Sequence, residues 1–490
     1  MKRSLWELVA ALGIPLKPEW QRIEISGITE DSRCIRPGYL FVAIRGYVDD
    51  GHRYVGEAIA RGASGIIVDA QRGTDSQIFP VPCIRLKNTR RGLAKIASAF
   101  WGHPTTGLFT VGVTGTNGKT TVCHLVGHLL GERETALITT IANEKHKLRA
   151  ITTPSSPLIQ EIAYDALVAG QKHLVIEVSS ASLPLHRVDA VDFDAAVFTN
   201  LTHDHLDFHG DRESYLEAKL MLFRGLKRAA WAIVNVDDPA AERVLGETRS
   251  RPFTFAMDRG ADLQAADIRY ERNRTTFSLR WEGRTAATTL RLPGEHNVAN
   301  ALAAASVGIQ QGLSLQAIAE RLACARNVEG RYQRFRARNG VTIIVDFAHS
   351  PDSLERMLEA VRPFHTRIIC VFGCPGQSDR EKRPLMGEIS GRLADLTILT
   401  TDNPKTEDPE RIIDEIEAGL APTGGRYERF ADRREAIRKA VKRALPDDVV
   451  LIAGKGHETY QIVGHEFMPY SDVAFLREED LVESGTSVVD

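Results

Sequence analysis

Residues 113–121 read VTGTNGKTT, and this stretch constrains the fold more strongly than any other part of the chain. An apolar, β-branched run at 108–113 predicts a buried strand, and residues 122–130 continue with apolar side chains at helical spacing. A strand, a glycine-rich loop and a helix together form the setting that a phosphate-binding loop requires. The sequence therefore predicts that phosphate groups bind here, at the N-terminus of a helix.

The residues of this loop have distinct predicted roles. Glycines allow backbone N–H groups to face phosphate oxygens, Lys119 would reach the outer phosphates, and the Thr120 hydroxyl would ligate Mg²⁺. The general pattern GxxxxGK[ST] has Val113 in place of its first glycine, so the loop is a shorter variant. A tight turn without a ligand is the alternative, but the lysine and threonine directly after the second glycine argue against it. We expect ATP phosphates at Gly115, Thr116, Asn117, Gly118, Lys119, Thr120 and Thr121.

Length and composition narrow the class of protein. A chain of 490 residues is too long for one hydrophobic core, so we expect two to four domains. The formal net charge of −2 provides no basic field for nucleic acid or a membrane surface. The six cysteines form no CxxC pair, as is typical of the reducing cytosol, and no run approaches the roughly 20 apolar residues that span a bilayer. We expect a cytoplasmic protein with no nucleic-acid or membrane partner.

Alternating strand and helix patterns predict an α/β protein with three domains. Residues 1–107 mix short strands and helices and form a small N-terminal α/β domain. Residues 108–330 predict a central, P-loop ATPase-like domain with a mostly parallel sheet and an antiparallel addition at 262–292. In residues 331–490, four apolar strands each end in a polar loop, which predicts a Rossmann-like domain with a binding face at the carboxyl ends of its strands.

A second concentration of polar groups follows two strands of the central domain. Glu177 ends one buried strand, and residues 198–210, FTNLTHDHLDFHG, follow the next. Mg²⁺ prefers oxygen ligands, so Glu177 and Thr120 could hold one ion, and a histidine could complete a second site. A solvated loop with ordinary histidines is the alternative. Lys219 would normally be interpreted as a solvent-facing helical lysine, and spacing alone does not reject that interpretation.

Ten motifs occur in order between residues 113 and 461: GTNGKTT, EVSS, FTNLxxDHLDxHG, YxxAKxxLF, HNxxN, GR, DFAHSPD, KRPLMG, DNPxxEDP and AGKGHExYQ. With this ordered set the chain resembles the Mur ligases over nearly its whole length. The additional segments DSR, LFVAIRG and DGH make it similar to the UDP-N-acetylmuramoyl-tripeptide synthetase (MurE) type. The resemblance implies an ATP-dependent ligase that converts a carboxylate into an acyl phosphate, which the amine of an amino acid then attacks.

The resemblance also implies the substrates and the metal site. The partners would be UDP-N-acetylmuramoyl-L-alanyl-D-glutamate and a free diamino acid, in peptidoglycan precursor synthesis, and the enzyme would act as a monomer. The residues implied for catalysis are Lys119, Glu177, His205 and Lys219, and Thr120, Glu177 and His205 would contact Mg²⁺. Lys219 would carry a CO₂-derived carbamate, because carbamylation turns a cation into an oxygen-bearing anion that suits a hard metal ion.

Further site residues follow from the same resemblance. For ATP these are Asn297 and Asn300 with Arg331 and Asp346, so ATP would lie between two domains; helix capping is the alternative role for the two asparagines. The N-terminal domain would bind UDP. The residues implied for the UDP-sugar-peptide substrate are Ser32, Thr152, Thr153, Ser179 and Arg187, and the guanidinium of Arg187 suits a phosphate or carboxylate. The family's SSHxL reads SSASL here, so Ala181 replaces a histidine.

The amino acid would be recognised by the DNPx and GKGHE loops. The residues implied are Asp402, Asn403, Lys405, Gly454 and Glu458, together with Arg380. Lys405 stands where members that add meso-2,6-diaminopimelate usually have arginine, which keeps the charge but loses the forked geometry. A cation at Lys405 and an anion at Glu458 fit the zwitterionic end of meso-2,6-diaminopimelate, whereas L-lysine would leave Lys405 as a repulsive neighbour. Ser378 replaces another expected arginine, and Arg380 is its candidate substitute.

Three classes of function stay open at this point. The first is the tripeptide-forming ligase, with meso-2,6-diaminopimelate, L-lysine, ornithine or another amino acid. The second is a Mur-type ligase diverted to a specialised peptide, which the changes at Ala181, Ser378 and Lys405 motivate. The third is a protein that binds a partner without catalysis. The presence of Lys119, Glu177, His205, Lys219 and Arg331 argues against the third class, because a degenerate relative should have lost some of them.

Overall fold

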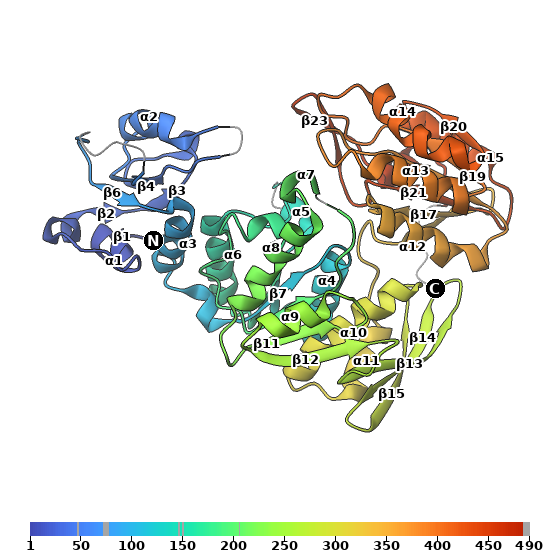
Figure 1. Cartoon of the computed structure of the whole chain (residues 1–490), viewed down its shortest axis with the longest axis horizontal. Helices are drawn as coiled ribbons and strands as arrows, with labels where there is room; N and C mark the ends of the chain where they lie inside the picture. The colour runs from blue at the N-terminus through green and yellow to red at the C-terminus, as the bar shows by residue number, and fades with distance from the viewer. Residues whose placement is uncertain (47–48, 72–77, 146–147, 149–150, 205, 484–490) are drawn as a thin grey trace.

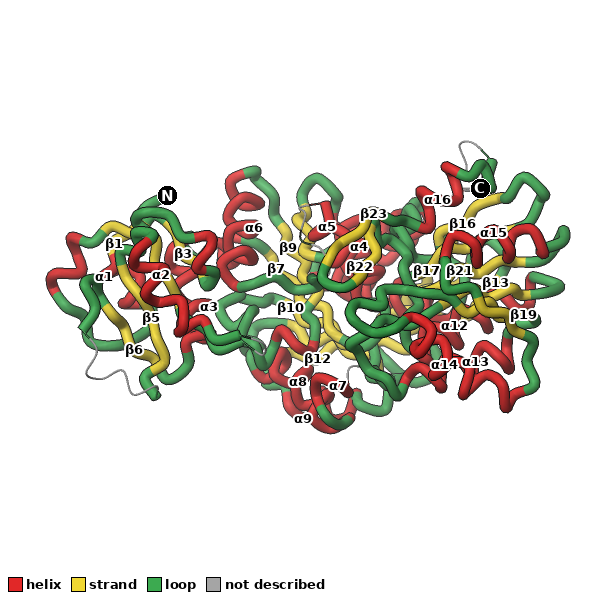
Figure 2. The backbone as a smooth tube through the Cα atoms, turned by 90° about the horizontal axis from the view of Figure 1, so that it is seen from above, coloured by secondary structure: helices red, strands yellow, loops and turns green. Residues whose placement is uncertain are grey.

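Three α/β units follow one another along the long axis of the molecule (Figures 1 and 2). The structure is a computed structural model that describes residues 1–46, 49–71, 78–145, 148, 151–204 and 206–483. The α/β fold class is confirmed, and a mostly parallel sheet lies at the centre of the chain. None of the helices in these described ranges combines the length and apolar character that a bilayer span demands.

The N-terminal unit contains a four-stranded, all-parallel sheet. Its order is β3-β4-β5-β6, with β3 at Gly27–Thr29, β4 at Tyr39–Val42, β5 at Gly65–Asp69 and β6 at Cys83–Leu86. A short antiparallel pair, β1 at Arg3–Ser4 and β2 at Glu24–Ile25, lies apart from it. The helices are α1 at Leu5–Ala10, α2 at Val55–Ala60 and α3 at Thr89–Phe100. The sheet buries apolar side chains on both faces, as parallel sheets require.

The central unit is built on a nine-stranded sheet of order β15-β14-β13-β12-β11-β10-β7-β9-β8. Strands β7 to β13 form a parallel run. Strands β13, β14 and β15 pair with one another in antiparallel and form the addition predicted at 262–292. The strands are β7 Phe109–Thr114, β8 Thr135–Ile138, β9 His173–Glu177, β10 Ala195–Phe198, β11 Trp231–Asn235, β12 Arg251–Ala256, β13 Leu263–Tyr270, β14 Thr275–Trp281 and β15 Arg284–Leu290.

Helices cover both faces of this sheet and divide its core in two. On one face α4 (Lys119–Leu130), α10 (Glu295–Gln310) and α11 (Leu315–Ala323) pack into a cluster that continues into the C-terminal unit. On the other face lie α6 (Ser156–Val168), α8 (Arg212–Arg224) and α9 (Ala241–Glu247). Two short helices, α5 (Thr140–Lys145) and α7 (Leu206–His209), complete the unit.

The strand order explains where a ligand can enter the central unit. After β7 the chain builds β8 and β9 on one side of this strand, and then crosses to β10 on the other side. In an open α/β sheet this reversal leaves a crevice beyond the carboxyl ends of the strands. The loop at 115–118 leaves β7 at that crevice, so the topology itself puts the glycine-rich loop where ligands bind.

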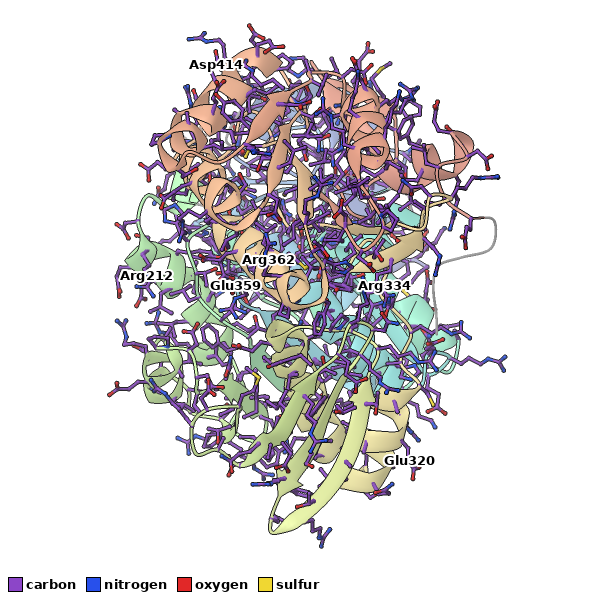
Figure 3. All side chains as sticks on the ribbon, turned by 90° about the vertical axis from the view of Figure 1, so that its right-hand side faces the viewer. Arg212, Glu320, Arg334, Glu359, Arg362 and Asp414 are labelled. Carbon is purple, nitrogen blue, oxygen red and sulfur yellow. The ribbon has the colours of Figure 1, made fainter. Side chains whose placement is uncertain are left out.

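The C-terminal unit has a six-stranded sheet of order β16-β17-β21-β18-β19-β20, in which only β16 is antiparallel. The strands are β16 Gln333–Arg336, β17 Thr342–Asp346, β18 Ile368–Phe372, β19 Leu396–Leu399, β20 Tyr427–Arg429 and β21 Val449–Ala453. The helices are α12 Pro351–Val361, α13 Lys382–Leu393, α14 Pro409–Leu420, α15 Arg433–Arg443 and α16 Asp472–Glu478, and a hairpin joins β22 Tyr460–Val463 to β23 Glu466–Pro469. In an end-on view, Glu359 and Arg362 lie where this unit meets the central one (Figure 3).

Candidate active site

The loop after β7 has a backbone that only glycine accommodates at two positions. Gly118 has a φ of 86°, and a Cβ there would lie 2.2 Å from Asn300 Oδ1. Gly115 has a φ of 147°, and its Cβ would lie 1.9 Å from Thr199 Oγ1. Both glycines therefore permit a close approach of the loop to neighbouring elements, as well as a conformation that other residues rarely adopt.

Asn200 holds this loop from the neighbouring strand β10. Its Oδ1 accepts a hydrogen bond from the Asn117 backbone N–H at 2.9 Å, and its carbonyl accepts one from Thr116 N–H at 2.9 Å. Thr199 Oγ1 donates to the Asn117 carbonyl at 2.7 Å. Sequence reasoning did not include Asn200 among the site residues, although its place directly after a buried strand was a usable signal.

Lys119 folds back over the loop. Its Nζ donates to the carbonyl oxygens of Gly115 at 3.1 Å and Thr116 at 2.7 Å. Burial lowers the pKa of Lys119, which Glu177 partly offsets by favouring the cation. The ammonium thus lies within the loop that is predicted to hold phosphates.

One cavity of about 460 Å³ collects most of the predicted catalytic and substrate residues. It opens beside the loop at 115–120 and reaches β9, α8 and the first residues of the C-terminal unit. Among the predicted residues that line it are Gly115, Thr116, Asn117, Gly118, Lys119, Thr120, Thr152, Thr153, Glu177, Ser179, Arg187, Lys219 and Arg331. His205 lies outside the described residues.

Glu177 contributes a buried carboxylate with one oxygen unused by the protein. The side chain is fully buried at the end of β9, and its Oε2 accepts hydrogen bonds from Thr140 N–H and Thr140 Oγ1, each at 2.8 Å. Its Oε1 is buried and has no hydrogen-bond partner among the described residues. A buried carboxylate oxygen needs a partner, and a hard cation such as Mg²⁺ would supply one. Thr140 was not predicted, but it too follows a strand end.

Lys219 is buried, so its interpretation as a solvent-facing lysine is wrong. Only 1% of the residue is exposed, and Nζ donates to the Gly115 carbonyl at 2.8 Å while lying 4.2 Å from the Tyr215 ring centroid. Burial, with a further contribution from Lys119, holds the pKa of Lys219 well below its usual range. The lysine can therefore supply the neutral amine that reaction with CO₂ requires.

The predicted UDP-sugar-peptide residues form a connected path. Thr153 Oγ1 donates to the Glu177 carbonyl at 2.6 Å and accepts from Ser179 N–H at 3.0 Å. Arg187 Nη1 donates to the Thr153 carbonyl at 2.6 Å. A second cavity of about 670 Å³ in the N-terminal unit is lined by Ser32 and also by Arg187. Arg187 thus lines both cavities, and a long substrate could extend from Ser32 to the loop at 115–120.

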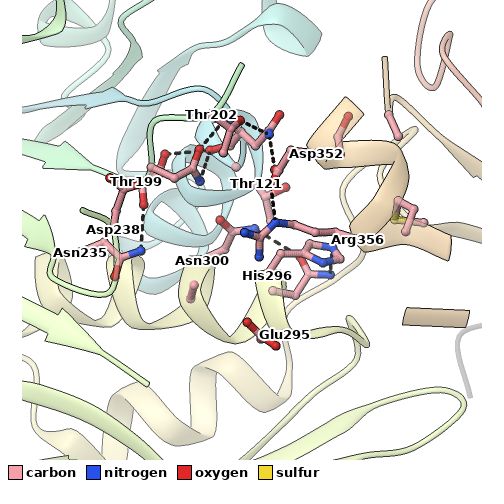
Figure 4. Close-up of a pocket in the computed structure, with 18 of the residues that line it drawn as sticks. Thr121, Thr199, Thr202, Asn235, Asp238, Glu295, His296, Asn300, Asp352 and Arg356 are labelled. Atoms are coloured by element: carbon pink, nitrogen blue, oxygen red, sulfur yellow. Dashed lines mark hydrogen bonds and ion pairs between the residues drawn. The ribbon is translucent and has the colours of Figure 1, made fainter. Parts of the chain in front are cut away.

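A third cavity, of about 370 Å³, lies between α10 and α12 (Figure 4). It is lined by all four residues predicted to contact ATP beyond the phosphates: Asn297, Asn300, Arg331 and Asp346. The two asparagines are not helix caps, because Gly294 is the N-cap of α10. Arg331 Nη2 donates to Thr120 Oγ1 at 3.0 Å, and Asp346 accepts from Tyr332 N–H at 2.6 Å.

His296, Asp352 and Arg356 also line this cavity and are among the residues that the sequence did not assign to the site (Figure 4). Asp352 Oδ2 accepts a hydrogen bond from Asn117 Nδ2 at 2.7 Å, which ties α12 to the loop after β7. Burial lowers the pKa of His296 to about 4. Asp352 lies within the motif DFAHSPD, so the motif signalled it, but its partner is 235 residues away in sequence.

The predicted amino-acid loops meet around a buried lysine. Lys455 is fully buried, and its Nζ donates to Asn403 Oδ1 at 3.0 Å and to Glu458 Oε2 at 2.7 Å. Asn403 Nδ2 also donates to Glu458 at 2.9 Å. Burial raises the pKa of Glu458, although Lys455 opposes the shift. Lys455 thus already pairs with the carboxylate that was expected to face the amino acid.

The remaining residues of this group lie in three places. Asp402 and Gly454 are in contact, since a Cβ on Gly454 would lie 2.6 Å from Asp402 Oδ2. Lys405 lies beside β22 and directs Nζ to the Gln377 carbonyl at 3.3 Å. Arg380 is bonded instead to Glu415 of α14, with 64% of its side chain exposed. Among the described contacts, none joins Arg380 to the loops of Asn403 and Glu458.

Comparisons with known proteins agree with this architecture. The Mur ligase family, catalytic domain, matches residues 24–101, the Mur ligase middle domain matches 113–308, and the Mur ligase, glutamate ligase domain, matches 330–456. The chain is 39% identical over 463 residues to UDP-N-acetylmuramoyl-L-alanyl-D-glutamate–2,6-diaminopimelate ligase of Caldanaerobacter subterraneus subsp. tengcongensis, a match that covers 93% of this chain and 95% of the relative.

Solved structures show the same likeness. A structure of UDP-N-acetylmuramoyl-L-alanyl-D-glutamate–2,6-diaminopimelate ligase is 31% identical, has a TM-score of 0.67 and covers 98% of each chain. A MurF ligase from Thermotoga maritima, solved in complex with ADP, shares the fold at 22% identity, with a TM-score of 0.64, 88% of this chain and 94% of that chain covered. The ordered motifs, the three domain matches and the extent of these similarities establish that the chain belongs to the Mur ligase family.

Proposed function

We propose that this protein is an ATP-dependent ligase that joins meso-2,6-diaminopimelate to the D-glutamate of UDP-N-acetylmuramoyl-L-alanyl-D-glutamate. The names of the relatives support this activity, as does their similarity over nearly the whole chain. One observation carries the proposal: a single cavity joins the loop at 115–120, the buried carboxylate of Glu177 and the buried Lys219. Arg187 connects this cavity with the one in the N-terminal unit.

The reaction has two steps that the residues can support. The substrate carboxylate attacks the γ-phosphorus of ATP, and ADP leaves as an acyl phosphate forms. The amine of the diamino acid then attacks the acyl carbon, losing a proton as phosphate leaves and the amide forms. Both reactants of the first step are anions, so cationic groups must lie around them. Lys119 and Arg331 are two of the basic residues that line the cavity beside the loop, together with Arg187 and Lys219.

The residues fit a magnesium site. Glu177 offers a buried oxygen that has no hydrogen-bond partner in the part of the chain that the structure describes, and Thr120 offers a hydroxyl in the same cavity. A carbamate on Lys219 and the imidazole of His205 would complete the ligands, in line with the family resemblance. When bound, Mg²⁺ would neutralise phosphate and carboxylate charge. Thr120, Glu177 and Lys219 would hold it, and Arg331 would orient the Thr120 hydroxyl.

The amino-acid loops favour a zwitterionic side chain. Lys455 neutralises Glu458, so the pocket retains hydrogen-bonding capacity without a strong net negative charge. Lys405 is a further cation, at the edge of β22. A purely cationic side chain such as that of L-lysine would meet two ammonium groups and one carboxylate, whereas diaminopimelate brings its own carboxylate. The charge balance therefore supports diaminopimelate over lysine.

A panel of amino acids tests the proposal. ADP release with the UDP-linked dipeptide should require meso-2,6-diaminopimelate and should be weak with L-lysine or L-ornithine. Lys405→Met should lower kcat/KM for diaminopimelate by roughly 30-fold or more, because it removes a half-buried cation that would pair with the distal carboxylate. Lys172→Met, which removes an exposed lysine paired with Glu134, is the matched control and should leave kcat/KM unchanged. Absence of ADP release with every diamino acid would overturn the proposal.

A second candidate is the same chemistry in a specialised peptide pathway. The exposed ion pair of Arg380 with Glu415, and Ser378 bonded to the Pro375 carbonyl, favour this candidate, because neither side chain takes the place of the arginine that the family uses. Expression of the chain in a host depleted of its own synthetase distinguishes the two. Full rescue of growth supports the cell-wall role, and ADP release with a non-wall amino acid but no rescue supports the alternative.

A further inference from the structure

A histidine from the central unit and two carboxylates from the C-terminal unit converge outside the active-site cavity. His203 lies in the loop after β10, and Asp379 and Glu381 lie in the loop between β18 and α13. One imidazole nitrogen and one oxygen from each carboxylate all lie within 4.8 Å of one another. None of the three lines the cavity that contains Glu177 and Lys219.

Two atoms of this cluster are buried and unsatisfied. Asp379 is only 4% exposed, and its Oδ2 has no hydrogen-bond partner among the described residues. His203 Nε2 is likewise buried without a hydrogen bond. The two atoms lie 3.4 Å apart without forming a hydrogen bond. Buried polar atoms are normally satisfied, so this arrangement calls for a missing partner.

The separation of these atoms fits a metal ion between them. A transition metal about 2.1 Å from each would subtend an angle of about 108° at their spacing of 3.4 Å, which is close to tetrahedral. The other oxygen of Asp379, Oδ1, accepts a hydrogen bond from Glu381 N–H at 3.0 Å, which orients Oδ2 toward the histidine. The neighbouring ammonium of Lys382 faces Asp204 at 3.8 Å.

We propose that His203, Asp379 and Glu381 form a binding site for a divalent transition-metal ion that bridges the central and C-terminal units. One imidazole and two carboxylates suit Zn²⁺, Co²⁺ or Mn²⁺ better than Mg²⁺, which prefers oxygen ligands alone. An ion held from both sides stabilises the arrangement in which α12 meets the loop after β7. The site is separate from the catalytic magnesium site, and the proposal stands independently of the substrate.

Cobalt titration of the full-length protein tests the site, because Co²⁺ bound by nitrogen and oxygen ligands has visible absorption bands. The metal-free protein is titrated in excess Mg²⁺. His203→Gln and Glu381→Gln should each weaken Co²⁺ binding by at least about tenfold. His128→Gln is the matched control, since it removes another partly exposed histidine paired with a carboxylate, Glu132, and should bind Co²⁺ like the wild type.

A variant of the catalytic site separates the two metal sites. Glu177→Gln should retain the Co²⁺ bands, because Glu177 is not a ligand of the bridging ion. The proposal is overturned if His203→Gln binds Co²⁺ as tightly as the wild type, or if the bands are lost in Glu177→Gln and kept in His203→Gln. Thermal unfolding without metal should give equal midpoints for His203→Gln and the wild type. Weaker Co²⁺ binding by the variant is then caused by the loss of a metal ligand, because the variant is folded as stably as the wild type.

Discussion

Burial changes the chemistry of single residues in this protein. Lys219 and His457 carry side chains that are ordinarily charged or titrate near neutrality, yet both are enclosed by the fold. Removal from water disfavours the charged form of each, which lowers the pKa of both groups. At the residue scale, the fold therefore converts common side chains into a nucleophilic amine and a neutral imidazole.

Lys219 should react with CO₂ at neutral pH. Its pKa lies well below the ordinary 10.5, so the neutral amine is populated at a pH where an exposed lysine is protonated. We expect a carbamate signal in ¹³C NMR of protein supplied with ¹³CO₂. Lys219→Met should abolish the signal and lower the rate of ADP release by at least roughly 100-fold. Lys227→Met, which replaces a lysine paired with Asp192 and Asp194, is the control and should keep both the carbamate signal and the rate of ADP release. Full activity of Lys219→Met would refute the carbamate.

His457 should make the protein less stable as the pH falls. Burial, aided by Arg331, lowers the pKa of this imidazole from 6.5 to about 3. Between those values the unfolded chain binds a proton that the folded chain does not, so stability is lost with falling pH. This group alone should cost about 2 kcal/mol of unfolding free energy between pH 7 and pH 5.

Urea denaturation at the two pH values measures this contribution. In His457→Gln the loss of stability between pH 7 and pH 5 should be smaller than in the wild type by about 2 kcal/mol. His465→Gln, at an exposed histidine of the same domain, should retain the wild-type loss. Identical pH dependence in His457→Gln and the wild type would contradict the assignment.

At the scale of elements, the candidate site residues lie at the carboxyl ends of parallel strands. The strand ends of β7, β8, β9 and β10 present the glycine-rich loop, Thr140, Glu177 and Asn200 at one crevice. In β17 and β21 the same positions carry Asp346 and the loop from Gly454 to Glu458. Strand polarity thus gathers residues that are distant in sequence, because parallel strands end at one edge.

Gly118→Ala tests how closely the loop must approach α10. A methyl group at this position would meet Asn300 Oδ1 at 2.2 Å, in a backbone conformation with a φ of 86°. We expect the Kd for ATP to rise by at least about tenfold, because the displaced Asn300 lines the cavity that we propose for ATP. A fluorescent ATP analogue measures the affinity.

Gly170→Ala is the control that separates the effect of a positive φ from the effect of a steric contact. Gly170 also has a positive φ, 75°, but a Cβ there would meet no atom within 4 Å. Both variants should lose about 1 kcal/mol of unfolding free energy, since both force alanine into the left-handed region. Only Gly118→Ala should lose ATP affinity. Equal ATP affinity in the two variants would show that the approach of Asn300 is not needed.

At the scale of the whole molecule, the cavity between α10 and α12 lies where two units meet. Its wall includes α10 of the central unit and α12 of the C-terminal unit, and one apolar cluster continues from one helix to the other. Two hydrogen bonds cross the boundary at the loop after β7, from Asn117 to Asp352 and from Arg331 to Thr120. The position of one unit relative to the other therefore determines whether the cavity is complete.

A double-mutant cycle on Asn117 and Asp352 tests this coupling. Their hydrogen bond of 2.7 Å includes a charged partner, so the cycle Asn117→Ala, Asp352→Ala and the double variant should show a coupling of about 1 kcal/mol in ATP binding. Pairing Asn117→Ala with Glu479→Ala, which removes a surface partner of Arg438, should show additive effects. Additivity in the Asn117–Asp352 cycle would mean that this contact does not complete the site.

The local parts of the site could be predicted because neighbouring residues determine them. The strand, the glycine turn and the helix around VTGTNGKTT are set by backbone preferences and hydrogen bonds over a few residues. The same holds for the α/β class, since the alternation of apolar strands and helices is written along the chain. Contiguous sequence therefore determined the glycine-rich loop after β7, the fold class and the strand ends that carry polar groups.

Only the tertiary structure decided which side chains are buried from water and which residues that are distant in sequence come into contact. Helical spacing could not decide whether Lys219 is exposed, whereas packing of α8 against the sheet buries it and lowers its pKa. Arg187 lines two cavities, and Asn117 meets Asp352 across 235 residues, because separate units pack together. Spacing along a chain sets local geometry, whereas burial and long-range contacts arise when many weak apolar contacts fix how the units pack.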